Sequence, residues 1–146
     1  GLQLGGLIFP TPLTFQDTSR GDLFHAALEN IAFSVRSNLT TLLDVTGLDP
    51  PTIHLGGGMA RGRGLATILA TVLGRRVRRS LTYQASGRGA AMTAAVAAEP
   101  TLTIQQVAQE AAGDFEEMEP GLAGDIARYQ ESYGQWLDLY ERLRRK

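Results

Sequence analysis

Apolar residues recur every three or four positions through several long stretches of this chain, a period typical of helices that bury one face. The first stretch predicts a helix that opens at Gly21 and Asp22, with Asp22 as its N-cap, and that ends at Gly47. Pro50 and Pro51 then prevent the helix from restarting. The apolar positions behind this prediction are Leu28, Ile31, Val35, Leu39 and Leu42.

The same period predicts further helices at 63–73 and 122–144. The alanine-rich segment 87–98 is also expected to be helical, and the spacing of a capping box opens a short helix at Thr103 that Gly113 ends. The last helix stacks aromatic and aliphatic residues on one face, which is expected to form core: Ile126, Tyr129, Tyr133, Trp136, Leu137, Tyr140 and Leu143.

Two short segments, 52–55 and 75–79, have the composition of strands, and 1–20 is predicted to be loop with at most one edge strand. Helices alternate with these strands, so we predict an α/β fold with a small sheet flanked by helices. A length of 146 residues with 43% hydrophobic content is enough for a compact core.

Bulk composition narrows the function classes. A net charge of −1 argues against a general polyanion binder, and the lack of cysteine removes disulfides, thiol catalysis and cysteine-type zinc sites. No stretch reaches the ~18 uninterrupted apolar residues of a membrane span. No secretory signal is visible either, so a cytoplasmic protein is expected.

The successive glycines Gly56, Gly57 and Gly58 stand between the predicted strand 52–55 and the predicted helix 63–73. This order places backbone N–H groups and the positive end of a helix dipole beside a gap without side chains. A nucleotide could approach the main chain closely there, although an ordinary tight turn explains the glycines equally well. Neither a dinucleotide fingerprint nor a P-loop is present, so the kind of nucleotide stays open.

Several segments follow one another in a recognisable order: ALENIAF at 27–33, LGGGMAR at 55–61, VLGRRV at 72–77, GAA at 89–91 and the aromatic helix at 129–140. Together they resemble the C-terminal part of the FGGY-family carbohydrate kinases, which include xylulokinases, glycerol kinases and autoinducer-2 kinases. The tryptophan of the last helix and the Met-Ala-Arg after the glycines favour the xylulokinase and autoinducer-2 kinase branches.

This resemblance implies a partial ribonuclease H-like, actin-like ATPase lobe, with 1–146 as the C-terminal part of a kinase ATP-binding domain. ATP and Mg²⁺ are the implied cofactors of the full-length protein, which would phosphorylate a hydroxyl of a small sugar or polyol. Gly57 and Gly58 would border the nucleotide, and Gly62 stands where the family often has a contacting serine or asparagine.

The catalytic aspartate and the sugar-binding residues of such kinases lie in an earlier lobe. The chain starts at Gly1 without a methionine, and a fragment that lacks this N-terminal lobe is therefore expected. We predict that these residues alone phosphorylate no sugar. The missing lobe is then the implied partner, a membrane or a nucleic acid is not expected, and a homodimer stays open.

Some positions depart from the family pattern. Gly62 lacks a polar side chain, Thr67 and Thr71 stand where glutamine and aspartate are common, and Gln84 stands where glutamate is common. These changes put smaller or neutral groups near the expected nucleotide side, so whether tight nucleotide binding survives is left open.

A run of arginines without an intervening acidic residue supports a second function. It could attract a triphosphate, or it could form the face by which a non-catalytic module of this fold meets a protein or nucleic acid. The simpler interpretation is a solvated rim or a surface that meets residues outside the chain. The run comprises Arg61, Arg63, Arg75, Arg76, Arg78, Arg79 and Arg88.

The remaining charged residues predict structure more than chemistry. The acidic stretch 110–119 is expected to be a solvated loop, since its spacing lacks the alternation of a calcium loop. His25 and His54 have no ligand partner nearby in sequence, so packing roles are expected, and no metal site is predicted. Glu29 is expected to make a structural hydrogen bond.

Overall fold

The computed structural model describes residues 18–82, 84–111 and 113–144. The prediction of a loop with at most one edge strand over 1–20 falls almost wholly outside these residues. The chain divides into two compact units, one made of residues 49–121 and the other of the segments that precede and follow it.

The unit built from the two ends of the chain contains α1 (Arg20–Thr46) and α5 (Ala123–Arg144). Ser19, and not the predicted Asp22, is the N-cap of α1: its hydroxyl accepts from the Asp22 backbone N–H at 3.2 Å. The Asp22 carboxylate accepts in return from the Ser19 N–H at 2.8 Å. These bonds form a capping box. The Ser19 hydroxyl, at 2.7 Å, and the Ser19 N–H both donate to the carboxylate and hold the pKa of Asp22 below its ordinary value. Gly47 ends the helix at a φ of 67°, as predicted.

Aromatic side chains form the core between α1 and α5. Phe33 is 5% exposed, and its ring centroid lies 6.2 Å from that of Tyr129, 5.9 Å from that of Tyr133 and 6.1 Å from that of Trp136. The indole N–H of Trp136 donates to Asn30 Oδ1 at 2.7 Å, which satisfies its polar edge. Of the predicted stripe, Tyr129 is buried, and Tyr133 and Trp136 pack against the same Phe33 ring while staying partly exposed.

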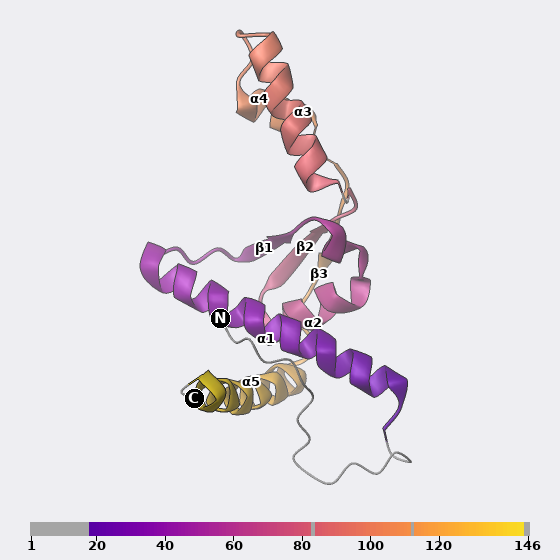
Figure 1. Cartoon of the computed structure of the whole chain (residues 1–146), viewed down its shortest axis with the longest axis vertical. Helices are drawn as coiled ribbons and strands as arrows, with labels where there is room; N and C mark the ends of the chain where they lie inside the picture. The colour runs from indigo at the N-terminus through magenta and orange to yellow at the C-terminus, as the bar shows by residue number, and fades with distance from the viewer. Residues whose placement is uncertain (1–17, 83, 112, 145–146) are drawn as a thin grey trace. The chain divides into compact units, whose positions relative to one another are not determined.

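The unit of residues 49–121 is an α/β structure around a three-stranded sheet of order β1-β2-β3 (Figure 1). β1 and β2 run parallel, and β3 is antiparallel to β2. The α/β prediction with a small sheet is confirmed. The elements are β1 (Thr52–Leu55), the 3₁₀ turn η1 (Gly58–Arg61), α2 (Arg63–Leu73), β2 (Arg76–Ser80), α3 (Ala85–Ala98), α4 (Ile104–Glu110) and β3 (Phe115–Met118).

The core of this unit lies where α2 packs against β2 and β3. Val77 on the central strand is 1% exposed and stands in register with Ile53 on one side and Met118 on the other. Gly74 ends α2 with a φ of 61°, a conformation that favours glycine. The buried apolar side chains contributed by η1 and α2 are Ala60, Leu65, Ala66, Ile68, Leu69, Ala70 and Val72.

The acidic stretch 110–119 is not the predicted solvated loop, because β3 lies within it. In the antiparallel register, Glu116 stands opposite Arg79 and Glu117 stands opposite Arg78. Opposite charges directly across a strand pair attract each other, so this polar segment can form an edge strand. The prediction failed because the segment has no apolar alternation of its own.

The helices α3 and α4 pack against each other. α3 begins at Ala85, slightly before its predicted start. The predicted capping box of α4 is present, with Thr103 Oγ1 accepting from the Gln106 N–H at 3.3 Å. α4 ends at Glu110, before the end that was predicted at Gly113.

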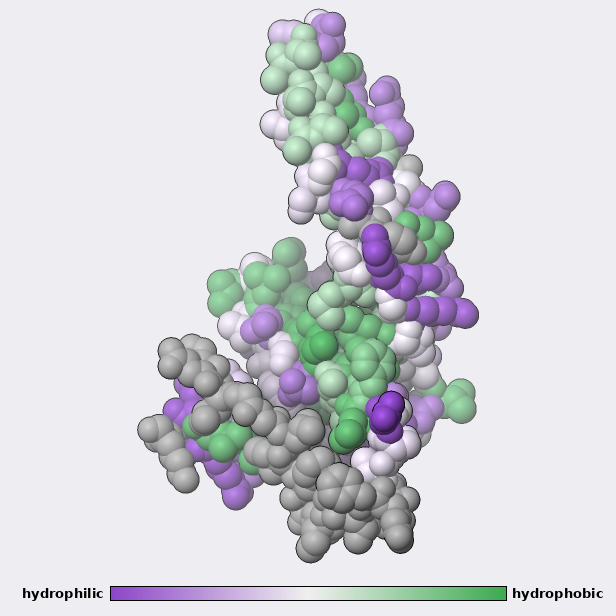
Figure 2. All heavy atoms as spheres, turned by 45° about the vertical axis from the view of Figure 1, so that its right-hand side comes forward, coloured by the Kyte–Doolittle hydropathy of each residue, from purple (hydrophilic) through white to green (hydrophobic). Residues whose placement is uncertain are grey.

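The alanines of α3 are largely exposed, and Figure 2 accordingly shows pale green surface over the α3–α4 pair at the top of the view. Across the described parts of the chain, no helix combines the length and the apolar character that a membrane crossing requires.

Candidate functional site

The glycine turn after β1 leaves a bare main-chain corner. Gly57 adopts a φ of 82°, a conformation that L side chains rarely take, so glycine is required there. A Cβ built on Gly56, Gly57 or Gly58 would meet no atom within 4 Å. The corner is therefore open to a ligand and is not filled by the chain's own side chains.

The N-terminus of α2 continues this open surface. Gly62 is its N-cap and supplies no side-chain hydrogen bond to the first-turn amides. A Cβ on Gly62 would lie 3.8 Å from the Met59 carbonyl oxygen, and one on Gly64 would meet nothing within 4 Å. The first amides of a helix lack intrahelical acceptors and carry its positive dipole end, so this surface favours an anionic or hydrogen-bond-accepting ligand.

Arg79 on β2 connects the turn to the sheet. Only 8% of this residue is exposed, and its Nη1 donates to the Ala60 carbonyl oxygen at 2.8 Å. Its Nε donates to Glu116 Oε2 on β3 at 2.7 Å. Ala60 itself is completely buried. A buried, paired guanidinium thus ties the 3₁₀ turn to the strands behind it.

Glu116 extends this support to the helix. Its second oxygen pairs with Nε of Arg63, the first residue of α2, at 3.0 Å. One carboxylate therefore bridges the arginine below the turn and the arginine at the start of the helix. Neither Arg79 nor Glu116 was predicted to support the turn, and the available signal was the opposite charge of two segments, with arginines in 76–80 and glutamates in 115–118.

The predicted arginine-rich face is mostly neutralised within the unit. Besides Arg63 and Arg79, three other arginines of the run each pair with a carboxylate. Arg75 Nη2 lies 2.6 Å from Asp49 Oδ1, Arg76 Nε lies 2.7 Å from Glu119 Oε1, and Arg78 Nε lies 3.8 Å from Glu117 Oε1. Arg79 is buried and so does not belong to the expected solvated rim, whereas Arg63 and Arg76 are exposed.

The family departures on α2 face β3 and the segment after it. Thr71 is buried, and its Oγ1 accepts from the Gly121 N–H at 3.1 Å. Thr67 Oγ1 donates to the Arg63 carbonyl oxygen at 3.1 Å and lies 3.7 Å from Met118 Sδ. Both threonines thus serve packing, while Gln84 is exposed at the N-cap of α3.

The histidines have packing roles, as predicted. His25 Nε2 lies 3.2 Å from Glu29 Oε1 and 3.5 Å from the Tyr129 hydroxyl. Burial raises the pKa of Tyr129 to about 12, and a hydrogen bond to Glu29 adds to the shift. His54 is exposed, with its ring centroid 5.9 Å from that of Phe115. Within the described ranges, no three His, Cys, Asp or Glu residues are placed to hold a metal ion.

A family comparison decides the ancestry of this fold. Residues 4–98 match the model described as "FGGY family of carbohydrate kinases, C-terminal domain", and that range contains the whole glycine turn. The chain belongs to the FGGY family of carbohydrate kinases. The resemblance carried by the separate sequence segments is confirmed.

Individual relatives agree with this assignment. A glycerol kinase of Enterococcus faecalis is 32% identical over 80 residues, which cover 55% of this chain and 16% of that protein. A solved xylulose kinase of Rhodospirillum rubrum is 29% identical with a TM-score of 0.70, covering 92% of this chain and 27% of its own. A glycerol kinase of Plasmodium falciparum solved with ADP has a TM-score of 0.68 at 18% identity, covering 91% and 26%.

These FGGY kinases have the actin-like ATPase fold, so the predicted fold class is confirmed. This chain spans about a quarter of the length of the solved kinases that it matches.

Proposed function

We propose that the turn 56–62 binds the nucleotide of an ATP-dependent FGGY kinase, which transfers a phosphoryl group to a hydroxyl of a small sugar or polyol. In this proposal Gly57 and Gly58 border the adenosine, and Gly62 offers its main chain where the family often has a polar side chain. We further propose that this kinase is cytoplasmic and that a second lobe closes over the bound nucleotide. A homodimer belongs to the same proposal.

The observation that carries this proposal is the bare corner. A Cβ at any of the successive glycines would meet nothing within 4 Å, so a flat purine could lie directly against the backbone. The uncapped first turn of α2 supplies N–H donors and a positive dipole end for phosphate oxygens. Arg79 and Glu116 keep this surface rigid, which lowers the entropic cost of binding.

ATP therefore fits the residues that are present, and when bound it supplies the phosphoryl group that is transferred. The chain's own residues bind the nucleotide and orient it. The residues around the turn do not fit Mg²⁺ in the same way, because Mg²⁺ needs oxygen ligands such as free carboxylates. Glu116, the carboxylate that bonds to Arg79 behind the turn, is already paired with Arg79 and Arg63. We therefore assign no Mg²⁺ ligand to the described residues.

Replacing Gly58 by leucine tests the site. A Cβ at Gly58 meets no atom, and the φ of Gly58 is not in the left-handed region, so the fold should tolerate the side chain. That side chain would occupy the space that we assign to the nucleotide. We expect Gly58→Leu to weaken ATP binding by roughly tenfold or more in calorimetric titration.

The matched control is Gly134→Leu on α5, where a Cβ also meets nothing within 4 Å. This variant adds the same apolar side chain in the other unit and should leave the affinity unchanged. Wild-type affinity in the Gly58→Leu variant, with its fold intact by circular dichroism, would refute the proposed site.

A further inference from the structure

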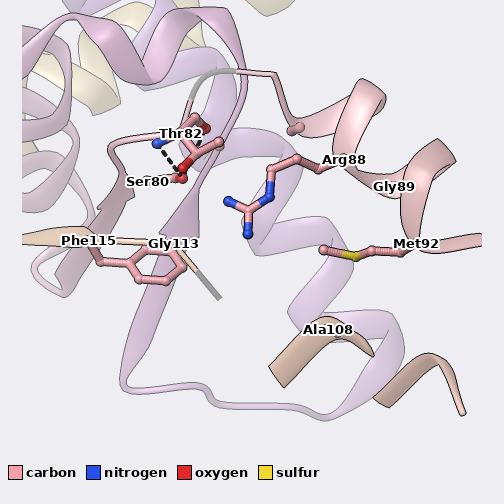
Figure 3. A pocket seen from close by; sticks show the side chains of 10 residues that line it. Ser80, Thr82, Arg88, Gly89, Met92, Ala108, Gly113 and Phe115 are labelled. Atoms are coloured by element: carbon pink, nitrogen blue, oxygen red, sulfur yellow. Dashed lines mark hydrogen bonds between the residues drawn. The ribbon is translucent and has the colours of Figure 1, made fainter. Parts of the chain in front are cut away.

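A pocket of about 310 Å³ opens beside the glycine turn, within the unit of residues 49–121. Gly56, the first residue of the turn, lines it together with Ser80 and Thr82 at the end of β2. Arg88 on α3 and Phe115 on β3 also line it, and Met92 and Ala108 add apolar surface (Figure 3). Its volume is near the lower end of the range for small-molecule sites.

Among the described residues that line this pocket, Arg88 alone is charged. Its side chain is half-buried and points into the pocket, toward Ser80, Thr82 and Phe115 (Figure 3). No hydrogen bond or ion pair joins its guanidinium to any other residue that the structure describes. This contrasts with Arg63, Arg75 and Arg79, each of which is paired with a carboxylate.

A partly buried guanidinium that pairs with none of the described residues has lost part of its hydration, and a bound anion would compensate that loss. An oxyanion supplies that contact most effectively, because phosphate and carboxylate oxygens match the paired N–H groups of arginine. The chemistry of the pocket therefore favours an anionic ligand.

The lack of a side chain on Gly113 leaves room for the polar groups of the pocket to approach one another. A Cβ on Gly113 would lie 2.7 Å from Arg88 Nη1 and 2.5 Å from Thr82 Oγ1, so both side chains converge over a backbone without a side chain. Ser80 Oγ is already engaged with the Thr82 main chain, accepting from its N–H at 3.1 Å and donating to its carbonyl oxygen at 3.0 Å. Arg88 and the Thr82 hydroxyl are then the polar side-chain groups that face a ligand.

We propose that Arg88 and Thr82 bind a phosphate group of the nucleotide whose adenosine lies at the glycine turn. Gly56 belongs both to the turn and to the pocket, so a single ligand can contact the two. This inference rests on the proposed function, and it adds a specific anion contact from α3 that the turn itself cannot supply.

Calorimetric titration of Arg88→Gln with ATP, adenosine and inorganic phosphate tests this inference. The matched control is Arg76→Gln, which removes the same charge. Arg76 forms an exposed pair with Glu119 and does not line the pocket. We expect Arg88→Gln to weaken ATP binding by roughly 10–100-fold, the effect of losing a charge-assisted hydrogen bond. Adenosine binding should be unchanged, and Arg76→Gln should change neither.

The outcomes separate this inference from the proposed function. Equal effects of Arg88→Gln on ATP and adenosine, or no effect on either, would refute the phosphate contact while leaving the nucleotide site intact. Failure of the wild-type chain to bind both ligands would refute the proposed function. In that case the titration with inorganic phosphate alone decides whether the pocket binds anions. Phosphate binding that Arg88→Gln abolishes supports an anion pocket for free phosphate, and no phosphate binding refutes the pocket.

Discussion

At the scale of single residues, the buried arginine Arg79 connects the glycine turn to the sheet. It donates to the carbonyl of Ala60 and to Glu116, so its loss would leave the buried Ala60 carbonyl unsatisfied and Glu116 with Arg63 as its remaining partner. A buried acceptor that loses its donor keeps its desolvation penalty, which costs more than the hydrogen bond itself contributes.

We therefore predict that Arg79→Met lowers the free energy of unfolding by roughly 2–4 kcal/mol, measured by urea denaturation. Arg76→Met is the control, because Arg76 forms an exposed pair with Glu119 and such pairs contribute only about 0–1 kcal/mol. Equal losses in the two variants would show that Arg79 is not a special support of the turn.

At the scale of elements, the pair of α1 and α5 has a built-in response to alkaline pH. Burial, with a contribution from Glu29, raises the pKa of Tyr129 from 10.0 to about 12, so the folded state favours the neutral phenol. A group whose pKa is raised on folding stabilises the fold fully below its unfolded value. That contribution is lost as the pH rises from 10.0 to about 12.

We predict that α1 and α5 lose stability over that range, followed through the fluorescence of Trp136, which lies in their aromatic core. Tyr129→Phe should flatten the pH dependence, since the variant has no phenol to ionise there. Tyr140→Phe on the same helix is the control and should retain the wild-type slope. A slope in Tyr129→Phe as steep as in the wild type would contradict this account.

The elements also show what local sequence can predict. The helices, β1 and the helix-ending glycines Gly47 and Gly74 were predictable because apolar period and left-handed caps are local features. β3 was not, since its glutamates become strand residues only when arginines distant in sequence stand opposite them. Asp22 was misassigned because a capping box contains polar residues at both of its ends.

The candidate site was likewise predictable only where it depends on local sequence. The open turn followed from its glycines and from the strand and helix around them. The support by Arg79 and the pocket around Arg88 could not be predicted, because both depend on which carboxylates reach which arginines in three dimensions. A run of arginines in sequence looks uniform, whereas the structure gives its members different roles.

At the scale of the whole molecule, the chain belongs to a kinase family while spanning about a quarter of the solved kinases that it matches. Phosphoryl transfer requires positioning of both substrates and stabilisation of developing charge. The described residues include the surface that we propose for the nucleotide, and we assign to them neither a general base nor a metal site.

We therefore predict that the 146-residue chain transfers no phosphoryl group to any member of a panel of sugars and polyols that includes glycerol and xylulose. A coupled assay that detects ADP formation measures this directly. The control is a complete FGGY kinase in the same assay. Sugar-dependent turnover by the chain alone would show that its catalytic groups have been overlooked.

The central claim is that the bare corner after β1 is a nucleotide surface, and backbone NMR of the labelled chain titrated with a non-hydrolysable ATP analogue tests it most directly. The account predicts saturable amide shifts concentrated at residues 56–64 and around the pocket that holds Arg88. Silence at 56–64, with shifts spread over the paired arginines of 75–79, would contradict it and would favour a non-catalytic anion-binding surface.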